Sequence, residues 1–133
     1  MKYLTIVYLG LVLGLVMLFF QDPELEESIE RGSEIYADFC VTCHMPNGEG
    51  VAHTFPPLAN SDYLKLNREA SIRGIKYGQD GELIVNGVTY NNTMAPLGLE
   101  DEEVADVMNF ILNSWGNSSE TKVTLEEVAI ITE

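Results

Sequence analysis

The sequence has few basic residues and almost no cysteine. Its 133 residues include seven Lys and Arg against 21 Asp and Glu, which gives a formal net charge of −14. Binding of the nucleic-acid backbone needs a concentrated basic surface, so nucleic acid is excluded as an expected partner. Two cysteines cannot form a disulfide framework, and the length leaves room for one domain.

One long apolar run is present, at the start of the chain. Residues 3–20 contain no charge, and Thr5 is their one neutral polar residue. At about 1.5 Å per residue the run is just long enough to span hydrocarbon. It ends in bulky side chains at 17–20, whereas a cleaved secretory signal ends in small ones. Residues 1–21 are therefore predicted to be a transmembrane helix that anchors the protein, with a cleaved signal peptide or a buried helix as the alternatives.

The positive charge at the start of the chain orients this segment. Lys2 and the amino terminus carry the positive charge next to it, so they are expected to stay in the cytoplasm. The rest of the chain then lies on the extracytoplasmic, periplasmic face. The connection from Phe20 to a helix that opens at Pro23 is very short, so we expect the domain to lie close to the bilayer.

After this run, the spacing of apolar residues predicts three main helices and hence an all-α domain. The first opens with Asp22 as N-cap and Pro23 at its first position. The later elements are a helix from Asn67 or Ser71 to about Tyr77, a short hairpin around Asn86-Gly87, and a helix over 104–115 ended by Gly116. Residues 117–133 are predicted to be an acidic tail. The expected organisation is thus an anchor over 1–21, a domain over 22–116 and a tail.

The chemistry is carried by the motif Cys40-Val41-Thr42-Cys43-His44. Two thiols at this spacing can each bond a vinyl group of a haem, and the adjacent histidine then lies beneath the iron as an axial ligand. CxxC also occurs as a redox disulfide or as half of a zinc site. The flanking sequence is helical rather than the βαβ context of a redox dithiol, and His53 is not at zinc-finger spacing. The motif therefore predicts one covalent haem c, with its iron.

An electron carrier needs a second axial ligand, and the candidates are Met94, Met108, Met45 and His53. Met108 falls on the apolar face of the last helix, where methionine usually fills the core. Met45 follows the proximal histidine too directly to reach the opposite face of the haem. Met94 lies in an irregular loop some fifty residues further on, from which a thioether can cross to the distal side. Met94 is therefore the predicted distal ligand, with His53 or an open iron as alternatives.

Taken in order, these features resemble the class I monohaem c-type cytochromes. The resemblance covers about residues 25–116 and runs through Gly32, Tyr36, CVTCH, Pro56-Pro57-Leu58, Met94 and the last helix. From Ile84 onward, the stretches IVNGVTYNNTMAPL, FILNSWGN and VTLEEV look like cytochrome c subunits or domains that accompany copper nitrite reductases and quinone-cofactor dehydrogenases.

The resemblance implies a class I cytochrome c fold, in which three helices wrap round one haem. Cys40 and Cys43 would be the thioether attachment points, His44 the proximal ligand and Met94 the distal ligand. Pro56 or Pro57 would accept a hydrogen bond from the ring of the proximal histidine, which fixes its tautomer. Gly32 and Tyr36 would meet Val107 and Phe110 where the first and last helices cross. Arg73 is a candidate partner of a haem propionate.

The expected function is electron transfer by a membrane-anchored, single-haem protein of a respiratory chain. It would carry electrons between a dehydrogenase or quinol-oxidising complex and a terminal oxidase or reductase. We do not expect an enzyme or a small-molecule substrate. The alternatives are a permanent haem c subunit of one dehydrogenase and, less favoured, a haem enzyme or gas sensor. The acidic composition predicts redox partners with a basic docking surface.

Overall fold

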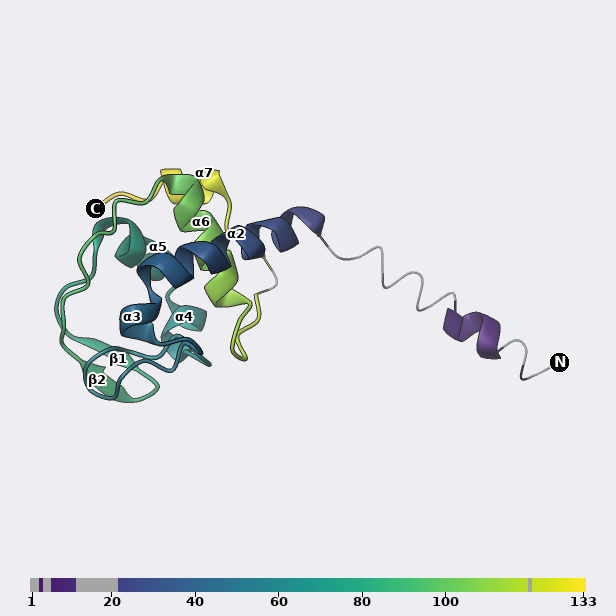
Figure 1. Cartoon of the computed structure of the whole chain (residues 1–133), viewed down its shortest axis with the longest axis horizontal. Coiled ribbons are helices and arrows are strands. Elements are labelled where there is room, and N and C mark those ends of the chain that lie inside the picture. The colour runs from purple at the N-terminus through teal and green to yellow at the C-terminus, as the bar shows by residue number, and fades with distance from the viewer. Residues whose placement is uncertain (1–2, 4–5, 12–21, 120) are drawn as a thin grey trace.

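The computed structural model describes residues 3, 6–11, 22–119 and 121–133. Its helices and strands are α2 (Pro23–Phe39), α3 (Val41–His44), α4 (Asp62–Leu66), α5 (Arg68–Tyr77), β1 (Leu83–Val85), β2 (Val88–Tyr90), α6 (Asp101–Leu112) and α7 (Leu125–Ala129). Helix α2 crosses α6, and the hairpin lies at the opposite end of the domain from α7 (Figure 1). The prediction of a mainly helical domain with one short hairpin is confirmed.

Most of the N-terminal apolar run lies outside the described residues. Of residues 1–21 the structure describes Tyr3 and 6–11, which are helical. Within the ranges that are described, no helix is both long enough and apolar enough to cross a membrane. The predicted transmembrane helix over 1–21 therefore falls largely outside the described part of the chain.

Asp22 caps the start of α2, and a glycine within α2 permits its close approach to α6. The side chain of Asp22 accepts a hydrogen bond from the backbone N–H of Glu24 at 3.0 Å, and Pro23 is the first helical residue, as predicted. Further along, a Cβ added at Gly32 would lie 2.1 Å from the carbonyl oxygen of Asp106 and 2.9 Å from Cβ of Phe110. Only glycine permits α2 and α6 to approach this closely.

The core is built on α6. Its apolar residues recur at helical spacing, so Val104, Val107, Met108 and Ile111 all face inward and are buried. They pack with Ile72 from α5 and with residues of α2 and α7.

The last helix ends earlier than predicted. Helix α6 stops at Leu112, and the chain then turns through left-handed backbone at Trp115, with φ of 51°, and at Gly116, with φ of 84°. The apolar spacing continues to Trp115 because this side chain also packs inward, against the ring of Tyr36 at 4.8 Å between centroids. The helical spacing of inward-facing residues therefore continues three residues beyond the end of α6.

The acidic tail is part of the folded unit, which corrects the prediction of a separate tail over 117–133. Val123 and Val128 are fully buried and Ile131 is 6% exposed, so three apolar residues among the acidic ones complete the core. Helix α7 packs on α6, and Glu127 forms an ion pair with Arg68 at 2.7 Å. The sequence alone did not show which apolar residues of this segment are buried, because acidic and hydroxyl residues surround them.

The hairpin has the predicted turn. Strands β1 and β2 pair antiparallel with Val85 opposite Val88, and the two residues between them have φ of 50° at Asn86 and 77° at Gly87. Positive φ at both positions suits an Asn-Gly turn whose twist matches that of the strands. The hairpin places Val85 and Tyr90 against the pocket described next.

Candidate haem site

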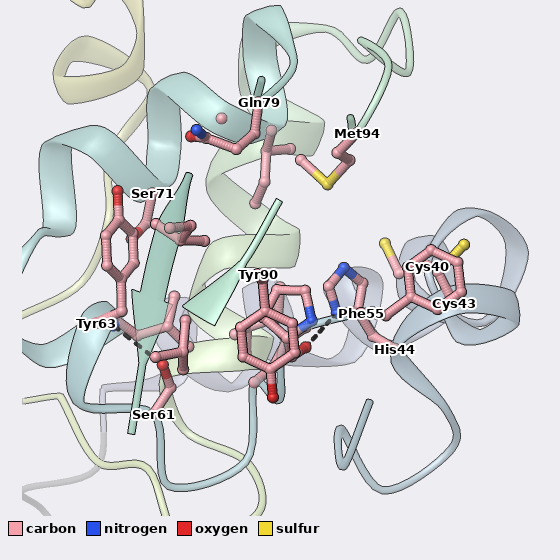
Figure 2. A pocket seen from close by; sticks show the side chains of 18 of the residues that line it. Cys40, Cys43, His44, Phe55, Ser61, Tyr63, Ser71, Gln79, Tyr90 and Met94 are labelled. Carbon is pink, nitrogen blue, oxygen red and sulfur yellow. Dashed lines mark hydrogen bonds between the residues drawn. The ribbon is translucent and has the colours of Figure 1, made fainter. Parts of the chain in front are cut away.

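A pocket of about 280 Å³ opens between α3, α5, the hairpin and the loop that carries Met94. Its walls are mainly apolar, and they include four of the predicted site residues, which are Cys40, Cys43, His44 and Met94. In Figure 2 the thioether of Met94 and the ring of His44 face the same space, with both cysteine sulfurs beside it. The fold thus brings the CVTCH motif to a residue that lies fifty positions further along the chain.

The CVTCH motif forms a single helical turn. Backbone N–H of His44 donates to the carbonyl of Cys40 at 2.9 Å, and α3 follows α2 with a change of direction at Cys40. Residues three apart lie on one side of a helical turn, so Cys40 and Cys43 face the same way. Both thiols are free and half-buried. Such a pair can bond two neighbouring substituents on one edge of a flat ring.

The ring of His44 is oriented by a backbone carbonyl. Its Nδ1 lies 2.9 Å from the carbonyl oxygen of Pro56, and because that oxygen can only accept, Nδ1 carries the proton. The other ring nitrogen, Nε2, therefore has its lone pair free, and Figure 2 shows it turned toward Met94. Burial lowers the pKa of His44, although the Pro56 hydrogen bond opposes this effect. A neutral imidazole with a free Nε2 is the form that binds iron.

The environment of the thiols argues against a redox dithiol. Burial, followed by the effect of Cys43, raises the pKa of Cys40 to about 11. Reactive cysteines need the opposite, a lowered pKa that maintains the thiolate. Across the described ranges, no three His, Cys, Asp or Glu side chains group as a metal site, so zinc finds no ligand set there.

The loop that carries Met94 is fixed although it has no regular structure. Backbone N–H of Met94 donates to the carbonyl of Gln79, and that of Gln79 donates back to Met94, both at 2.8 Å. The next two side chains upstream hold the same loop: Thr93 donates to Asp80 at 2.8 Å, and Asn92 donates to the Thr54 carbonyl at 2.9 Å. The backbone from which the Met94 side chain extends is therefore held in place.

Of the two prolines predicted to assist the histidine, Pro56 supplies the carbonyl. Pro57 lines the pocket, and no hydrogen bond joins it to His44 within the described residues. Proline lacks an N–H and fixes its own φ, so two in succession make a stiff run beside the ring.

Arg73 does not line the pocket, and its predicted role as a propionate partner stays a prediction. Its guanidinium forms an ion pair with Glu69, one turn earlier on α5, and donates to the carbonyl of Thr132 at 3.0 Å. Arg73 is thus paired within α5 and with the C-terminal segment. The physical reason is local: acid and base four residues apart on a helix are neighbours.

The other candidate iron ligands lie where the sequence analysis placed them. Met108 is fully buried in α6, and although it touches the pocket wall it belongs to the core. Met45 receives a hydrogen bond on its carbonyl from the hydroxyl of Tyr36 at 2.7 Å. His53 is exposed in a turn, with φ of 59°, and is absent from the pocket wall.

The hydroxyl groups of the pocket were not predicted from the sequence. Ser61, Tyr63 and Ser71 line the side away from the cysteines, and Tyr90 lies between them and His44 (Figure 2). No Lys or Arg lines the pocket in the described part of the chain. Ser61 is the N-cap of α4, and the pair Ser61-Asp62 is a sequence signal for such a helix start. The local sequence does not show that these four residues line one pocket.

The residues present fit a haem c. Two free thiols lie side by side at the edge of an apolar pocket, a neutral imidazole nitrogen faces into it, and a thioether faces the same space. Thiols, imidazole and thioether are the groups that c-type haem and its iron accept.

Comparison with known proteins agrees with this chemistry. The Cytochrome c family model matches residues 29–115. The chain is 40% identical over 106 residues to cytochrome c-552 of Thermus thermophilus, a match that covers 73% of this chain and 80% of that protein.

Two further relatives are parts of dehydrogenases. The chain is 29% identical over 106 residues to the cytochrome c subunit of the quinone alcohol dehydrogenase of Gluconobacter oxydans, covering 73% of this chain and 21% of that subunit. It is 30% identical over 126 residues to the gluconate 2-dehydrogenase cytochrome c subunit of Pantoea cypripedii, covering 84% of this chain and 27% of that subunit. The chain thus corresponds to about a quarter or less of these two proteins.

Proposed function

Because the chain belongs to the cytochrome c family, and so carries a covalently bound haem c with its iron, we propose that it is a single-haem electron carrier built on four residues. Cys40 and Cys43 form the two thioether bonds. His44 and Met94 are the axial ligands of the iron. The protein carries electrons for other proteins and does not transform a substrate of its own.

The observation that carries this proposal is the convergence on one pocket. The motif and the methionine are fifty residues apart in the sequence, yet the imidazole Nε2 of His44 and the thioether of Met94 face one apolar space. Each is held by the backbone, His44 through Pro56 and Met94 through Gln79. Rigid placement of both ligands suits electron transfer, in which the site must change little between oxidation states.

When bound, the haem supplies a one-electron iron couple, and the chain's residues tune it. A thioether ligand favours ferrous iron and raises the reduction potential. The hydrogen bond from Nδ1 of His44 to Pro56 raises the basicity of the imidazole and acts in the opposite direction. The apolar wall excludes water, which favours the less charged, reduced state.

Covalent attachment is tested by producing the protein with a c-haem maturation system and running it on a denaturing gel stained for haem. The wild type retains haem, and the double variant Cys40→Ser, Cys43→Ser loses it. Thr42→Ala, between the two cysteines, is the matched control and keeps it. Haem retained by the double variant would overturn the assignment of the thiols.

A carrier is separated from a haem enzyme or gas sensor by carbon monoxide. If Met94 occupies the sixth position of the iron, the reduced protein does not bind carbon monoxide and its visible spectrum is unchanged. A rapid spectral change on addition of the gas would indicate an open iron and contradict the carrier.

We also propose that residues 1–21 anchor the protein in the membrane with the haem domain, which starts at 22, on the periplasmic face. The basis is the uncharged run over 3–20, which follows Lys2 and ends in bulky residues. Membrane fractionation with N-terminal sequencing tests it. A mature soluble form that begins near residue 21 would contradict the anchor.

The partners are proposed to be a dehydrogenase or quinol-oxidising complex and a terminal oxidase or reductase, each with a basic docking surface. The second candidate function is that of a permanent subunit of one dehydrogenase, which the similarity to two dehydrogenase cytochrome c subunits favours. Affinity purification from membranes at moderate salt distinguishes them, since a subunit co-purifies with its dehydrogenase at fixed stoichiometry and a mobile carrier does not.

A further inference from the structure

Behind the proximal side of the haem pocket lies a short segment, residues 115–117, that the proposed function does not use. Its last residue, Asn117, is 8% exposed and donates two hydrogen bonds from its side-chain amide. One goes from Nδ2 to the carbonyl of Leu58 at 2.7 Å, and the other from Nδ2 to the carbonyl of Ile111 at 2.9 Å. A single amide thus ties the end of α6 to the loop that carries Pro56.

Leu58 is the place where that loop can be held. Pro56 and Pro57 have no N–H, so neither can be fixed through a backbone donor. Leu58, the next residue, uses both of its backbone groups: its N–H donates to Gly48 at 2.7 Å and its carbonyl accepts from Asn117. Because the prolines are stiff, a displacement at Leu58 is carried to the Pro56 carbonyl two residues away.

Residues 115–117 have little room to move. It turns through left-handed backbone at Trp115 and Gly116. A Cβ added at Gly48 would meet the Trp115 ring at 2.5 Å, and one added at Gly116 would meet the Asn60 side chain at 2.4 Å. The two residues that precede Asn117 are therefore in direct contact with Gly48 and with the side chain of Asn60, which restricts the position of the Asn117 amide.

The amide of Asn117 is not fully satisfied. Its Oδ1 is buried and has no hydrogen-bond partner in the described part of the chain. A buried acceptor without a partner destabilises a fold. Packing alone would therefore favour an apolar residue here, and the feature that an apolar residue lacks is the N–H₂ group that reaches Leu58.

We propose that Asn117 is a positioning residue, which holds the Pro56 carbonyl against Nδ1 of His44 and so keeps the reduction potential of the haem low. The inference rests on the proposed function, in which His44 is the proximal ligand. A firm hydrogen bond to Nδ1 gives the imidazole more anionic character and stabilises the ferric iron. Loosening the loop weakens that bond and makes reduction easier.

The test uses the full holoprotein and compares Asn117→Ala with Asn113→Ala. Asn113 is the matched control, because its Nδ2 donates to Asn109 within the same helix end, at 2.8 Å, and none of its hydrogen bonds reaches residues 56–58. The midpoint potential is measured by spectroelectrochemical titration. The exchange rate of the His44 Nδ1 proton with solvent is measured by NMR of the reduced protein.

Asn117→Ala is expected to shift the equilibrium toward ferrous haem by up to about tenfold, or about 59 mV for one electron, and to speed exchange of the Nδ1 proton. Asn113→Ala leaves both quantities at the wild-type value, although it lowers the melting temperature. If Asn117→Ala does not mature, the milder Asn117→Ser is used, with a smaller shift in the same direction.

An unchanged potential and exchange rate in a folded Asn117 variant would overturn the inference, whatever the melting temperature does. The visible spectrum separates this result from a failure of the proposed function. If the absorption due to methionine ligation is present in all variants, the iron ligands are as proposed and only the role of Asn117 is at stake. If the wild type lacks it, the ligand assignment itself fails.

Discussion

The functional side chains of this protein are held mainly by backbone atoms. Nδ1 of His44 donates to the carbonyl of Pro56, the hydroxyl of Tyr36 to that of Met45, and the amide of Asn117 to that of Leu58. Every residue has a backbone carbonyl, whatever its type. A sequence can therefore indicate which side chain donates a hydrogen bond, but not which carbonyl accepts it. The geometry of the haem site therefore depends on the course of two loops more than on further side chains of the motif.

Asp106 is the most consequential charge outside the pocket. Its carboxylate is buried in α6, accepts two hydrogen bonds from the guanidinium of Arg31 and accepts one from Ser28 at 2.6 Å. Asp106→Ala would leave these donors without their acceptor, so we expect a loss of about 2–3 kcal/mol in the free energy of unfolding. Chemical denaturation measures it.

Glu102→Ala is the control for Asp106, because Glu102 is exposed on the same helix and its removal changes stability by no more than about 0.5 kcal/mol. Equal effects of the two substitutions would mean that the Asp106 network adds nothing to the crossing of α2 and α6.

Single residues also mark what the sequence could and could not predict. Cys40, Cys43 and His44 were predictable because their chemistry depends on spacing within one helical turn. Met94 followed from elimination of the other candidates. The ion pair of Arg73 with Glu69, four residues away, was not predicted. The pairing of a long charged side chain depends on its surroundings in space, which one sequence does not reveal.

At the scale of elements, the crossing of α2 and α6 rests on Gly32. In an exposed helix, replacing glycine by alanine stabilises by up to about 1 kcal/mol. Here the sign reverses, because the new methyl group would overlap the carbonyl of Asp106. Gly32→Ala is expected to destabilise the protein by about 3 kcal/mol, measured by thermal unfolding of the holoprotein.

Glu34→Ala, at an exposed position on α2, serves as the control for Gly32 and should stay within about 0.5 kcal/mol of the wild type. A neutral or stabilising Gly32→Ala would show that the helices do not cross as closely as described.

Elements with strong local signals were predicted, and those that depend on docking were not. Asp22-Pro23 marks a helix start and Asn86-Gly87 a turn, and both are where the sequence placed them. Helix α7 has only five residues, too short a stretch for a spacing of apolar residues to indicate a helix, so it was taken for a tail. Its stability comes from burying Val128 on α6, a contact that no local pattern contains.

The docking of α7 should depend on pH. The hydrogen bond from Arg68 lowers the pKa of Glu127 below its ordinary value of 4.5, although burial opposes it. A carboxyl whose pKa is lowered by folding adds stability above its unfolded pKa, and that stability is lost as pH falls through the folded pKa. The protein should therefore lose stability as pH falls below about 4.5, because Glu127 of the unfolded chain, which has its ordinary pKa, then binds a proton more readily than Glu127 of the folded protein.

Denaturation midpoints from pH 7 to pH 3 for the wild type and Glu127→Gln provide the measurement. The variant is expected to be less stable at pH 7 and to show a smaller fall toward pH 3. Parallel profiles would mean that the ion pair of Arg68 and Glu127 does not contribute.

At the scale of the whole molecule, the net charge of the protein controls how fast it associates with charged redox partners. With a net charge of −14, the protein attracts cations over a range that salt shortens, since the screening length is about 10 Å at 0.1 M. We expect oxidation of the reduced protein by a cationic cobalt complex to slow as salt rises, and oxidation by ferricyanide to quicken.

Stopped-flow rates across a series of ionic strengths measure both trends. The pair of reagents is its own control, because a general effect of salt on the protein would change both rates in the same direction. The same trend for both would contradict electrostatic steering by the acidic surface.

The most direct test of the account is the visible spectrum of the oxidised holoprotein, because a weak band near the red end reports a methionine sulfur on ferric haem. The account predicts that the band is present in the wild type, absent in Met94→Leu, and retained in Met108→Leu, whose methionine touches the same pocket from the core. A wild-type spectrum without the band, or a band that survives Met94→Leu, would contradict ligation by His44 and Met94.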